Sequence, residues 1–215
     1  MLTIWGRATS SNVQAVMWCV GELGLDHIRH DIGHIHGGLD SDEFAHLNPN
    51  RQIPVIRDHD NPPIWETGAI LRYLAARYGS EVFWPSDPAP RAQVDKWTEW
   101  GKLNAEDRFT GPVFWRVVRT PPDRQDPAAI REAVDRLERS LAIADTQLAQ
   151  HPFLAGDHFT PADIQLGHIL WRYYDIDIDR RPLPHLAAYH ERLMTRPAYQ
   201  THVMIGYEIL RGSLL

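Results

Sequence analysis

Four consecutive polar residues, Thr9-Ser10-Ser11-Asn12, lie between the first predicted strand and the first predicted helix. At a helix N-terminus, free N–H groups and the positive end of the helix dipole stabilise an anion, to which a hydroxyl can also donate. The same residue types are common N-caps. Ser11 followed three residues later by Gln14 fits a capping box, which predicts a structural role for Ser11 and leaves Ser10 and Asn12 to face a ligand. Thr9 and Ser11 stay open as alternatives to Ser10.

A second group of candidate binding residues surrounds Pro54. A proline inside a sheet loses a ladder hydrogen bond, so Pro54 at the entrance of a short apolar run predicts a turn, with a peptide bond that is a candidate for cis. Such a turn frees the N–H and C=O of Ile53 to pair with an extended ligand. Further on, Glu66 and Thr67 mark a helix N-terminus suited to an anionic group, with Thr67 as the expected cap. The segment predicts a site for an extended peptide that carries a carboxylate.

The first eighty residues alternate strand and helix patterns. A strand, an apolar-periodic helix and a second strand form a βαβ unit, which a short helix, two further strands and a last helix follow. This order predicts a thioredoxin-like α/β domain over residues 1–80. The predicted elements are strands 2–5, 28–32, 53–57 and 64–65, and helices 13–23, 44–47 and 70–78.

The remainder of the chain has no strand periodicity. The run Pro-Ser-Asp-Pro-Ala-Pro disrupts helix and strand alike, which predicts an interdomain linker over residues 81–90. Apolar stripes at helical spacing then predict an all-helical domain over residues 91–215. The best-defined helix start is at Thr160, with Pro161 in the first position, Asp163 in the third, and a Phe159/Ile164 hydrophobic staple.

Composition excludes several classes of protein. The chain is 43% hydrophobic with a formal net charge of −6, and it has no Lys/Arg-rich run, so a nucleic-acid partner is not expected. No apolar run reaches the roughly 18–20 residues of a membrane span, and the N-terminus lacks a basic signal region. We therefore expect no membrane association and a cytoplasmic location.

Cysteine and histidine point to no metal site. Cys19 is the single cysteine and shares helical spacing with Val16 and Leu23, so it is predicted to be a buried apolar residue. His34 and His36 would share one face of a strand or loop, but no third ligand is spaced to join them. They are expected to be solvent-facing polar residues.

Three motifs together resemble the glutathione transferase family. They are Gln52-Ile53-Pro54 followed by Glu66-Thr67, the Ser10-Ser11-Asn12-Val13 run typical of serine-type members, and the helix start at Thr160 in the second half of the chain. The resemblance implies glutathione as co-substrate and no metal. In the family, the matching serine donates a hydrogen bond to the glutathione sulfur, a role that falls on Ser10 with Asn12 as an auxiliary donor.

The resemblance also implies the remaining glutathione contacts. Thr67 would hold the γ-glutamyl carboxylate, Glu66 the γ-glutamyl amine, Ile53 before the cis Pro54 the cysteinyl backbone, and Gln52 the glycyl end. Arg51 stands where the family usually has glycine, so it either conflicts with a positive φ or adds a cation for the glycyl carboxylate. The second substrate, a hydrophobic electrophile, would lie against the first long helix of the second domain, for which the candidates are Asn104, Arg108 and Phe109.

The leading prediction is a detoxifying glutathione transferase that activates the thiol as thiolate for attack on an electrophilic small molecule. One alternative is a glutathione-dependent disulfide or peroxide reductase of the same fold. Members with a mixed-disulfide mechanism usually have cysteine at the position of Ser10, whereas disulfide reduction by bound thiolate needs no protein cysteine. A second alternative is a non-catalytic binding or regulatory module that keeps the fold. The resemblance further implies a homodimer whose seam joins helix 69–78 of one subunit to helix 92–107 of the other.

Overall fold

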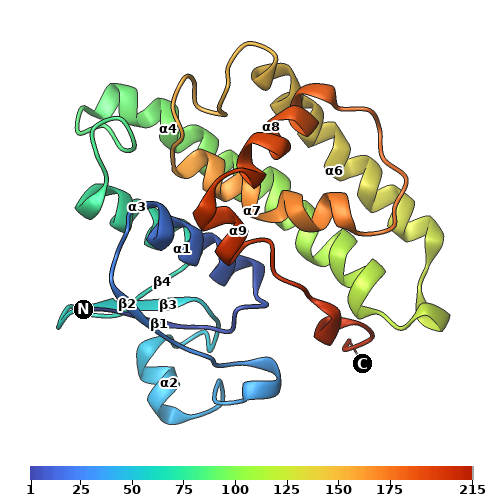
Figure 1. The fold of residues 1–215 in the computed structure, drawn as a ribbon. Coiled ribbons are helices and arrows are strands. Elements are labelled where there is room, and N and C mark those ends of the chain that lie inside the picture. The colour runs from blue at the N-terminus through green and yellow to red at the C-terminus, as the bar shows by residue number, and fades with distance from the viewer. Residues whose placement is uncertain (215) are drawn as a thin grey trace.

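The chain folds into an α/β half and a helical half, as a computed structural model describes for residues 1–214 (Figure 1). The α/β half contains a four-stranded sheet in the order β2-β1-β3-β4. Strand β1 pairs parallel with β2 and antiparallel with β3, and β3 pairs antiparallel with β4. This arrangement confirms the predicted thioredoxin-like domain. The strands are β1 (Leu2–Trp5), β2 (His27–His30), β3 (Val55–Asp58) and β4 (Ile64–Trp65).

The two helices α1 (Ser11–Glu22) and α3 (Thr67–Tyr78) lie on the face of the sheet that is turned toward the helical half, and α2 (Asp42–Leu47) lies on the other side (Figure 1). The apolar residues that predicted the first helix are buried in α1, among them Val13, Val16 and Val20. Cys19 is fully buried as predicted, and burial raises the pKa of its thiol. The core of this half therefore lies between the sheet and the two helices.

Trp18 extends this core into the helical half. Its indole is fully buried and packs against the rings of Phe159 and Tyr199, with centroids 5.4 Å and 4.7 Å away. A Cβ on Gly167 would lie only 2.8 Å from the indole, so the close approach of the two halves requires glycine at this position. Helix α1 is thereby held between the sheet and the helical half.

The helical half begins earlier than the predicted linker boundary. Helix α4 starts at Pro88, and the Asp87 carboxylate caps it by accepting from the N–H of Ala89 at 3.0 Å. The prolines that were expected to extend the linker to residue 90 therefore lie in the first helical turn, where the missing N–H costs nothing. The helices of this half are α4 (Pro88–Trp100), α5 (Asp107–Phe109), α6 (Pro127–Leu148), α7 (Pro161–Asp175), α8 (Pro184–Met194) and α9 (Pro197–His202).

Between α4 and residue 119 the chain continues as one long helix with two wide, π-helical stretches, Gly101–Glu106 and Thr110–Arg119. A π-turn closes i→i+5 hydrogen bonds, so it holds more residues per turn than an α-helix. Side chains on one face of this helix are therefore four to five residues apart.

Helix α7 starts as predicted. The fully buried Asp163 carboxylate accepts hydrogen bonds at 2.8 Å from the N–H groups of Thr160 and Leu154 and from the Tyr189 hydroxyl. Burial raises the pKa of Asp163 to about 6, although these hydrogen bonds act in the opposite direction. Through these bonds the Asp163 carboxylate joins α7 to α8 and to the loop that precedes α7.

Two further observations qualify the sequence predictions. Strand β2 lies at the edge of the sheet, and its Ile28 is 42% exposed. The apolar alternation of this strand therefore does not place Ile28 in the core. Within residues 1–214, none of the helices combines the length and the apolar character that crossing a bilayer requires.

Two buried histidines predict a loss of stability in acid. Burial lowers the pKa of His168 to about 3 and that of His190 to about 4 from an ordinary value of 6.5. Their contribution is present above pH 6.5 and is lost as the pH falls, because the unfolded chain then binds protons that the folded chain does not. Each histidine should lower the free energy of unfolding by about 1.4 kcal/mol per pH unit in this window.

His190→Phe tests this prediction, because the phenyl ring can keep the stacking of His190 on Tyr174. The free energy of unfolding, measured in urea at several pH values between 4 and 6.5, should depend on pH less steeply in the variant, by about 1.4 kcal/mol per pH unit. An unchanged slope would show that His190 does not titrate between the folded and unfolded states.

Candidate active site between the two halves

A cleft of about 410 Å³ opens where the start of α1 meets the long helix of the second half. Several predicted site residues line it together. From the α/β half these are Ser10, Asn12, Arg51, Gln52 and Ile53, together with the alternatives Thr9 and Ser11. The long helix contributes residues outside the predicted set, namely Lys102, Glu106, Asp107, Thr110, Gly111, Phe114 and Trp115. Pro54, Glu66 and Thr67 lie beside the cleft and not on its wall.

The start of α1 differs from the predicted capping pattern. Ser10 holds the N-cap position and Ser11 is the first helical residue, and the hydroxyl of Ser10 makes no cap hydrogen bond. The Gln14 side chain does not close a capping box with Ser11, because its Nε2 donates to the carbonyl of Ala8 at 3.1 Å. The assignment of Ser11 as a cap was therefore wrong. Both serines line the cleft, so capping does not separate their roles.

Ile53 and Pro54 are joined by a cis peptide bond, as expected from the position of the proline. Strand β3 begins at Val55, so Ile53 stands just outside the sheet on the wall of the cleft. The neighbouring Gln52 is exposed, and its carbonyl accepts a hydrogen bond from Asn48 Nδ2 at 2.8 Å.

Arg51 adopts a φ of +53°, a left-handed conformation that is uncommon for residues other than glycine. Its guanidinium donates to the carbonyls of Leu39 and Ser41 at 3.1 Å and 2.9 Å. The arginine is thus compatible with the backbone of this position, and it fastens the loop in front of α2 to the edge of the cleft.

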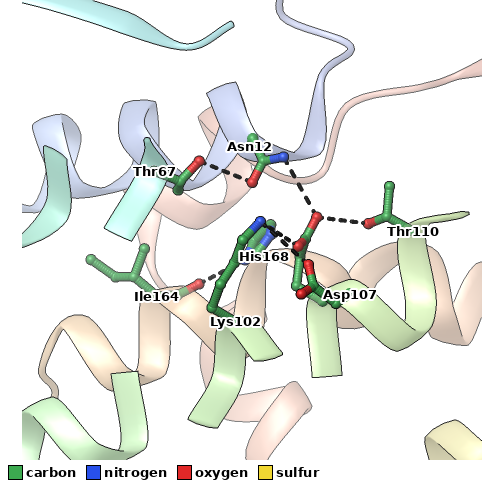
Figure 2. Close-up of polar contacts among 8 residues, drawn as sticks. Asn12, Thr67, Lys102, Asp107, Thr110, Ile164 and His168 are labelled. Carbon is green, nitrogen blue, oxygen red and sulfur yellow. Dashed lines mark hydrogen bonds and ion pairs between the residues drawn. The ribbon is translucent and has the colours of Figure 1, made fainter. Parts of the chain in front are cut away.

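A chain of side-chain hydrogen bonds links the two halves of the protein (Figure 2). Thr67 Oγ1 donates to Asn12 Oδ1 at 2.9 Å, and Asn12 Nδ2 donates to Glu106 Oε1 at 3.5 Å. Thr110 Oγ1 donates to the same Glu106 oxygen at 3.1 Å, and Lys102 Nζ donates to Glu106 Oε2 at 2.5 Å. Glu106 is 3% exposed, so these partners offset the cost of burying its charge.

This network changes two expectations from the sequence. Thr67 is the first residue of α3 and uses its hydroxyl to bond Asn12, so the prediction that it caps this helix was wrong. Glu66 holds the N-cap position with a φ of +68° and an exposed side chain that makes no cap bond. A non-glycine residue in this conformation at a helix N-terminus is typical of functional sites.

The predicted second-substrate residues do not line the cleft. Phe109 is 1% exposed in the core, and Arg108 donates to Ser140 of α6 at 2.5 Å and to Asn104 at 3.0 Å. Asn104, Arg108 and Phe109 therefore face away from the cleft. The cleft-facing Lys102, Glu106, Thr110 and Phe114 form one row at four-residue steps. Asn104 and Arg108 lie on a neighbouring row, from which Arg108 reaches Ser140 of α6.

The cleft also contains cationic residues that the sequence did not single out. Arg7 follows β1, Arg119 ends the long helix, and Arg172 lies on α7, and all three contribute to its wall. They come from segments far apart in the chain, so no local motif could have found them.

No group of three metal-ligating side chains gathers anywhere in the described residues 1–214. His36 is exposed as predicted. His34 is only partly exposed, and its pKa is lowered by burial and by the nearby charges of Arg7 and Arg119. His34 and His36 therefore do not behave as one pair of solvent-facing residues.

Comparison with known proteins agrees with this architecture. Residues 9–77 match the family model "Glutathione S-transferase, N-terminal domain", and residues 109–197 match "Glutathione S-transferase, C-terminal domain". The chain belongs to the glutathione transferase family.

Individual relatives cover nearly the whole chain. Glutathione S-transferase GstB of Escherichia coli K12 is 34% identical over 206 residues, which cover 95% of this chain and 99% of the relative. The theta class glutathione S-transferase from Xanthomonas axonopodis pv. citri, solved with glutathione bound, is 41% identical with a TM-score of 0.90, over 95% of this chain and 98% of that one. Disulfide-bond oxidoreductase YghU of E. coli K12 is 34% identical over 82% of this chain and 64% of its own length.

The hydrogen bond between Asn12 and Thr67 should couple the stabilities of the two positions. In a double-mutant cycle with Asn12→Ala and Thr67→Val, we expect a coupling energy of about 1 kcal/mol in urea unfolding. Asn12→Ala alone should cost more than Thr67→Val alone, because it also removes a partner of the buried Glu106. Strictly additive effects would show that this contact does not join α1 to α3.

Proposed function

We propose that this protein is a glutathione transferase that binds glutathione on its α/β half and an electrophile against the long helix. The observation that carries the proposal is the shared cleft, whose wall combines Ser10, Ser11 and Ile53 with residues of the long helix. The relative from X. axonopodis pv. citri, solved with glutathione bound, supports glutathione as the ligand.

For the tripeptide, we assign the γ-glutamyl end to the start of α3. The free N–H groups and dipole of a helix N-terminus favour a carboxylate at Thr67, and the exposed Glu66 carboxylate suits the γ-glutamyl amine. Ile53 pairs with the cysteinyl backbone, and Gln52 and Arg51 lie toward the glycyl end. Since the guanidinium of Arg51 already bonds two carbonyls, its main part is to hold the loop.

This placement brings the cysteinyl thiol to the start of α1. Ser10 donates a hydrogen bond to the sulfur, and together with the helix N-terminus it favours the thiolate over the thiol. Each pKa unit of depression corresponds to about 1.4 kcal/mol of preferential stabilisation. Asn12 bonds Thr67 and Glu106 and so positions the start of α1, and its second amide N–H is the auxiliary donor.

The thiolate attacks an electrophilic carbon held in the same cleft, so a carbon–sulfur bond forms while the leaving group departs with its electron pair. Binding both reactants in one cleft contributes proximity. Trp115, which is 39% exposed, supplies aromatic surface for the electrophile on the side of the long helix, and the buried Phe114 lies beside it in the cleft wall. Detoxification and a cytoplasmic location are part of this proposal.

Reduction of disulfides or peroxides is the second candidate, which the similarity to YghU favours. The single cysteine gives no support for a mixed-disulfide route, because Cys19 is fully buried in α1. Bound glutathione would have to attack the disulfide itself, with a second glutathione completing the reaction. Turnover of an aryl halide, a peroxide and a glutathionylated disulfide, compared side by side, ranks the two candidates.

Ser10→Ala and Ser11→Ala test the assignment of the thiol. We expect Ser10→Ala to raise the pKa of the bound thiol by about one to two units, the value of a hydrogen bond to an anion. Ser11→Ala should shift it far less, and neither variant should lose cap stability, because the Ser10 hydroxyl makes no cap bond and Ser11 lies inside the helix. Thiolate absorbance titrated against pH measures the shift, and thermal melting checks the fold.

If Ser11→Ala raises the pKa of the bound thiol and Ser10→Ala does not, the thiol faces Ser11 and not Ser10. If neither variant shifts it, the helix N-terminus alone stabilises the thiolate and the role given to Ser10 is wrong.

We also propose a homodimer in which α3 of one subunit contacts α4 of the other. Within the chain, Arg72 of α3 bonds Asp95 and Glu99 of α4, so the two helices form one continuous surface. The half-buried Trp97 and Trp100 add aromatic area on α4. Light scattering at micromolar concentration should give twice the 24.7 kDa chain mass, and the monomer mass would exclude the dimer.

A further inference from the structure

Three arginines, Arg7, Arg119 and Arg172, line the same cleft. Arg172 is 2% exposed, donates to the Thr9 carbonyl at 2.8 Å, and lies over the ring of Phe114 at 4.7 Å. Its Nε is buried and has no hydrogen-bond partner in the described residues, and the same is true of Arg7 Nε. Buried, unpaired N–H groups on cations are costly unless something accepts from them.

Within residues 1–214 no carboxylate pairs with any of the three. Other arginines of the protein form ion pairs with carboxylates, for example Arg72 with Asp95 and Arg196 with Glu22. The acidic residues on the cleft wall, Glu106 and Asp107, lie about three helical turns before Arg119 and are engaged by Lys102. Positive charge at this end of the cleft is therefore left without a counter-ion from the described chain.

The titration of these groups agrees with their proximity. Burial and the charge of Arg119 lower the pKa of Arg7, and burial, with a smaller effect of Arg7, lowers the pKa of Arg172 to about 10. Such mutual repulsion between cations is relieved when an anion binds among them.

We propose that Arg7, Arg119 and Arg172 form an oxyanion subsite that holds the carboxylate of the second substrate, so that the preferred electrophile is an aromatic acid. The inference rests on the proposed transferase function and names its substrate class. Arginine guanidiniums match carboxylates in shape as well as charge. Phe114 and Trp115 lie beside the subsite, and Arg119 stacks on Trp115 at 4.9 Å, which suits an aromatic ring next to the anion.

The position of the subsite fits the reaction. Arg172 bonds the carbonyl of Thr9, the residue before Ser10, so an anion held there lies next to the proposed thiol position. For an aryl halide, the sulfur–carbon bond forms and the carbon–halogen bond breaks, and halide leaves with the bonding electrons. The carboxylate keeps its charge throughout, so the arginines orient the substrate without exchanging protons.

A matched pair of substrates tests the subsite, namely 4-chloro-3-nitrobenzoate and its neutral methyl ester. For each enzyme, kcat/KM is divided by the uncatalysed rate with free glutathione, and the carboxylate-to-ester ratio is the readout. Arg119→Gln and Arg7→Gln should each lower this ratio about tenfold, as loss of a charge-assisted hydrogen bond predicts. Arg119→Lys, which keeps the charge, should recover part of it.

Arg116→Gln is the matched control, because Arg116 lies on the same helix, is exposed and bonds the carbonyl of Ala129 outside the cleft. It should leave the ratio unchanged. An equal ratio in the wild type, Arg119→Gln and Arg7→Gln enzymes would overturn the subsite.

Glutathione also carries a carboxylate at its glycyl end. A binding measurement must therefore show whether the arginines hold that carboxylate or the carboxylate of the second substrate. We expect calorimetry with S-methylglutathione to give similar affinities in wild type and Arg119→Gln. A large loss in the variant would show that the arginines hold the glycyl carboxylate, and the proposal would be wrong.

A second binding measurement tests the subsite without any turnover. With S-methylglutathione bound, 4-chloro-3-nitrobenzoate should bind wild type about tenfold more tightly than Arg119→Gln. If neither substrate is turned over but this difference is found, the transferase function fails and the subsite stands. If turnover is found without the difference, the subsite fails and the function stands.

Discussion

The position of α1 is the constraint on which the rest of the structure depends. One face of this helix covers the sheet, and Trp18 on the other face enters the helical half against Gly167, Phe159 and Tyr199. A large aromatic ring packed against a residue without a side chain leaves little freedom for the two halves to move apart. Because the helix is held in this way, its N-terminus, which carries Ser10 and Ser11, has a defined place on the cleft wall.

Hydrogen bonds on both sides of this apolar contact then fix the positions of the helices that form the cleft. The Thr67–Asn12–Glu106 chain joins α3 and α1 to the long helix (Figure 2). Arg172 of α7 also bonds the carbonyl of Thr9. Glu106 is buried and needs these donors, so separating the halves would leave its charge unpaired. The α/β half supplies the surface for glutathione, and the opposing wall exists only when the helical half is docked.

Local patterns predicted most of the fold, because apolar periodicity and helix-start residues act over a few positions. The order of strands and helices along the first eighty residues, the α1 stripe and the Asp163 cap follow from such patterns and were confirmed. The cap assignments at Ser11 and Thr67 were wrong for a different reason. A hydroxyl at a helix start can bond its own helix or a distant partner, and for Thr67 the partner is Asn12, 55 residues away.

The second wall of the cleft was harder to predict. The resemblance implied Asn104, Arg108 and Phe109 as candidates, but Arg108 bonds Ser140 of α6 and Phe109 is buried in the core. Arg7, Arg119 and Arg172 meet only through the tertiary fold.

A crystal structure with glutathione bound tests the central claim most directly. We expect the γ-glutamyl end at the start of α3, the cysteinyl backbone against Ile53, and the sulfur within about 3.5 Å of Ser10 Oγ. Glutathione bound outside this cleft, or with its sulfur turned away from the start of α1, would contradict it.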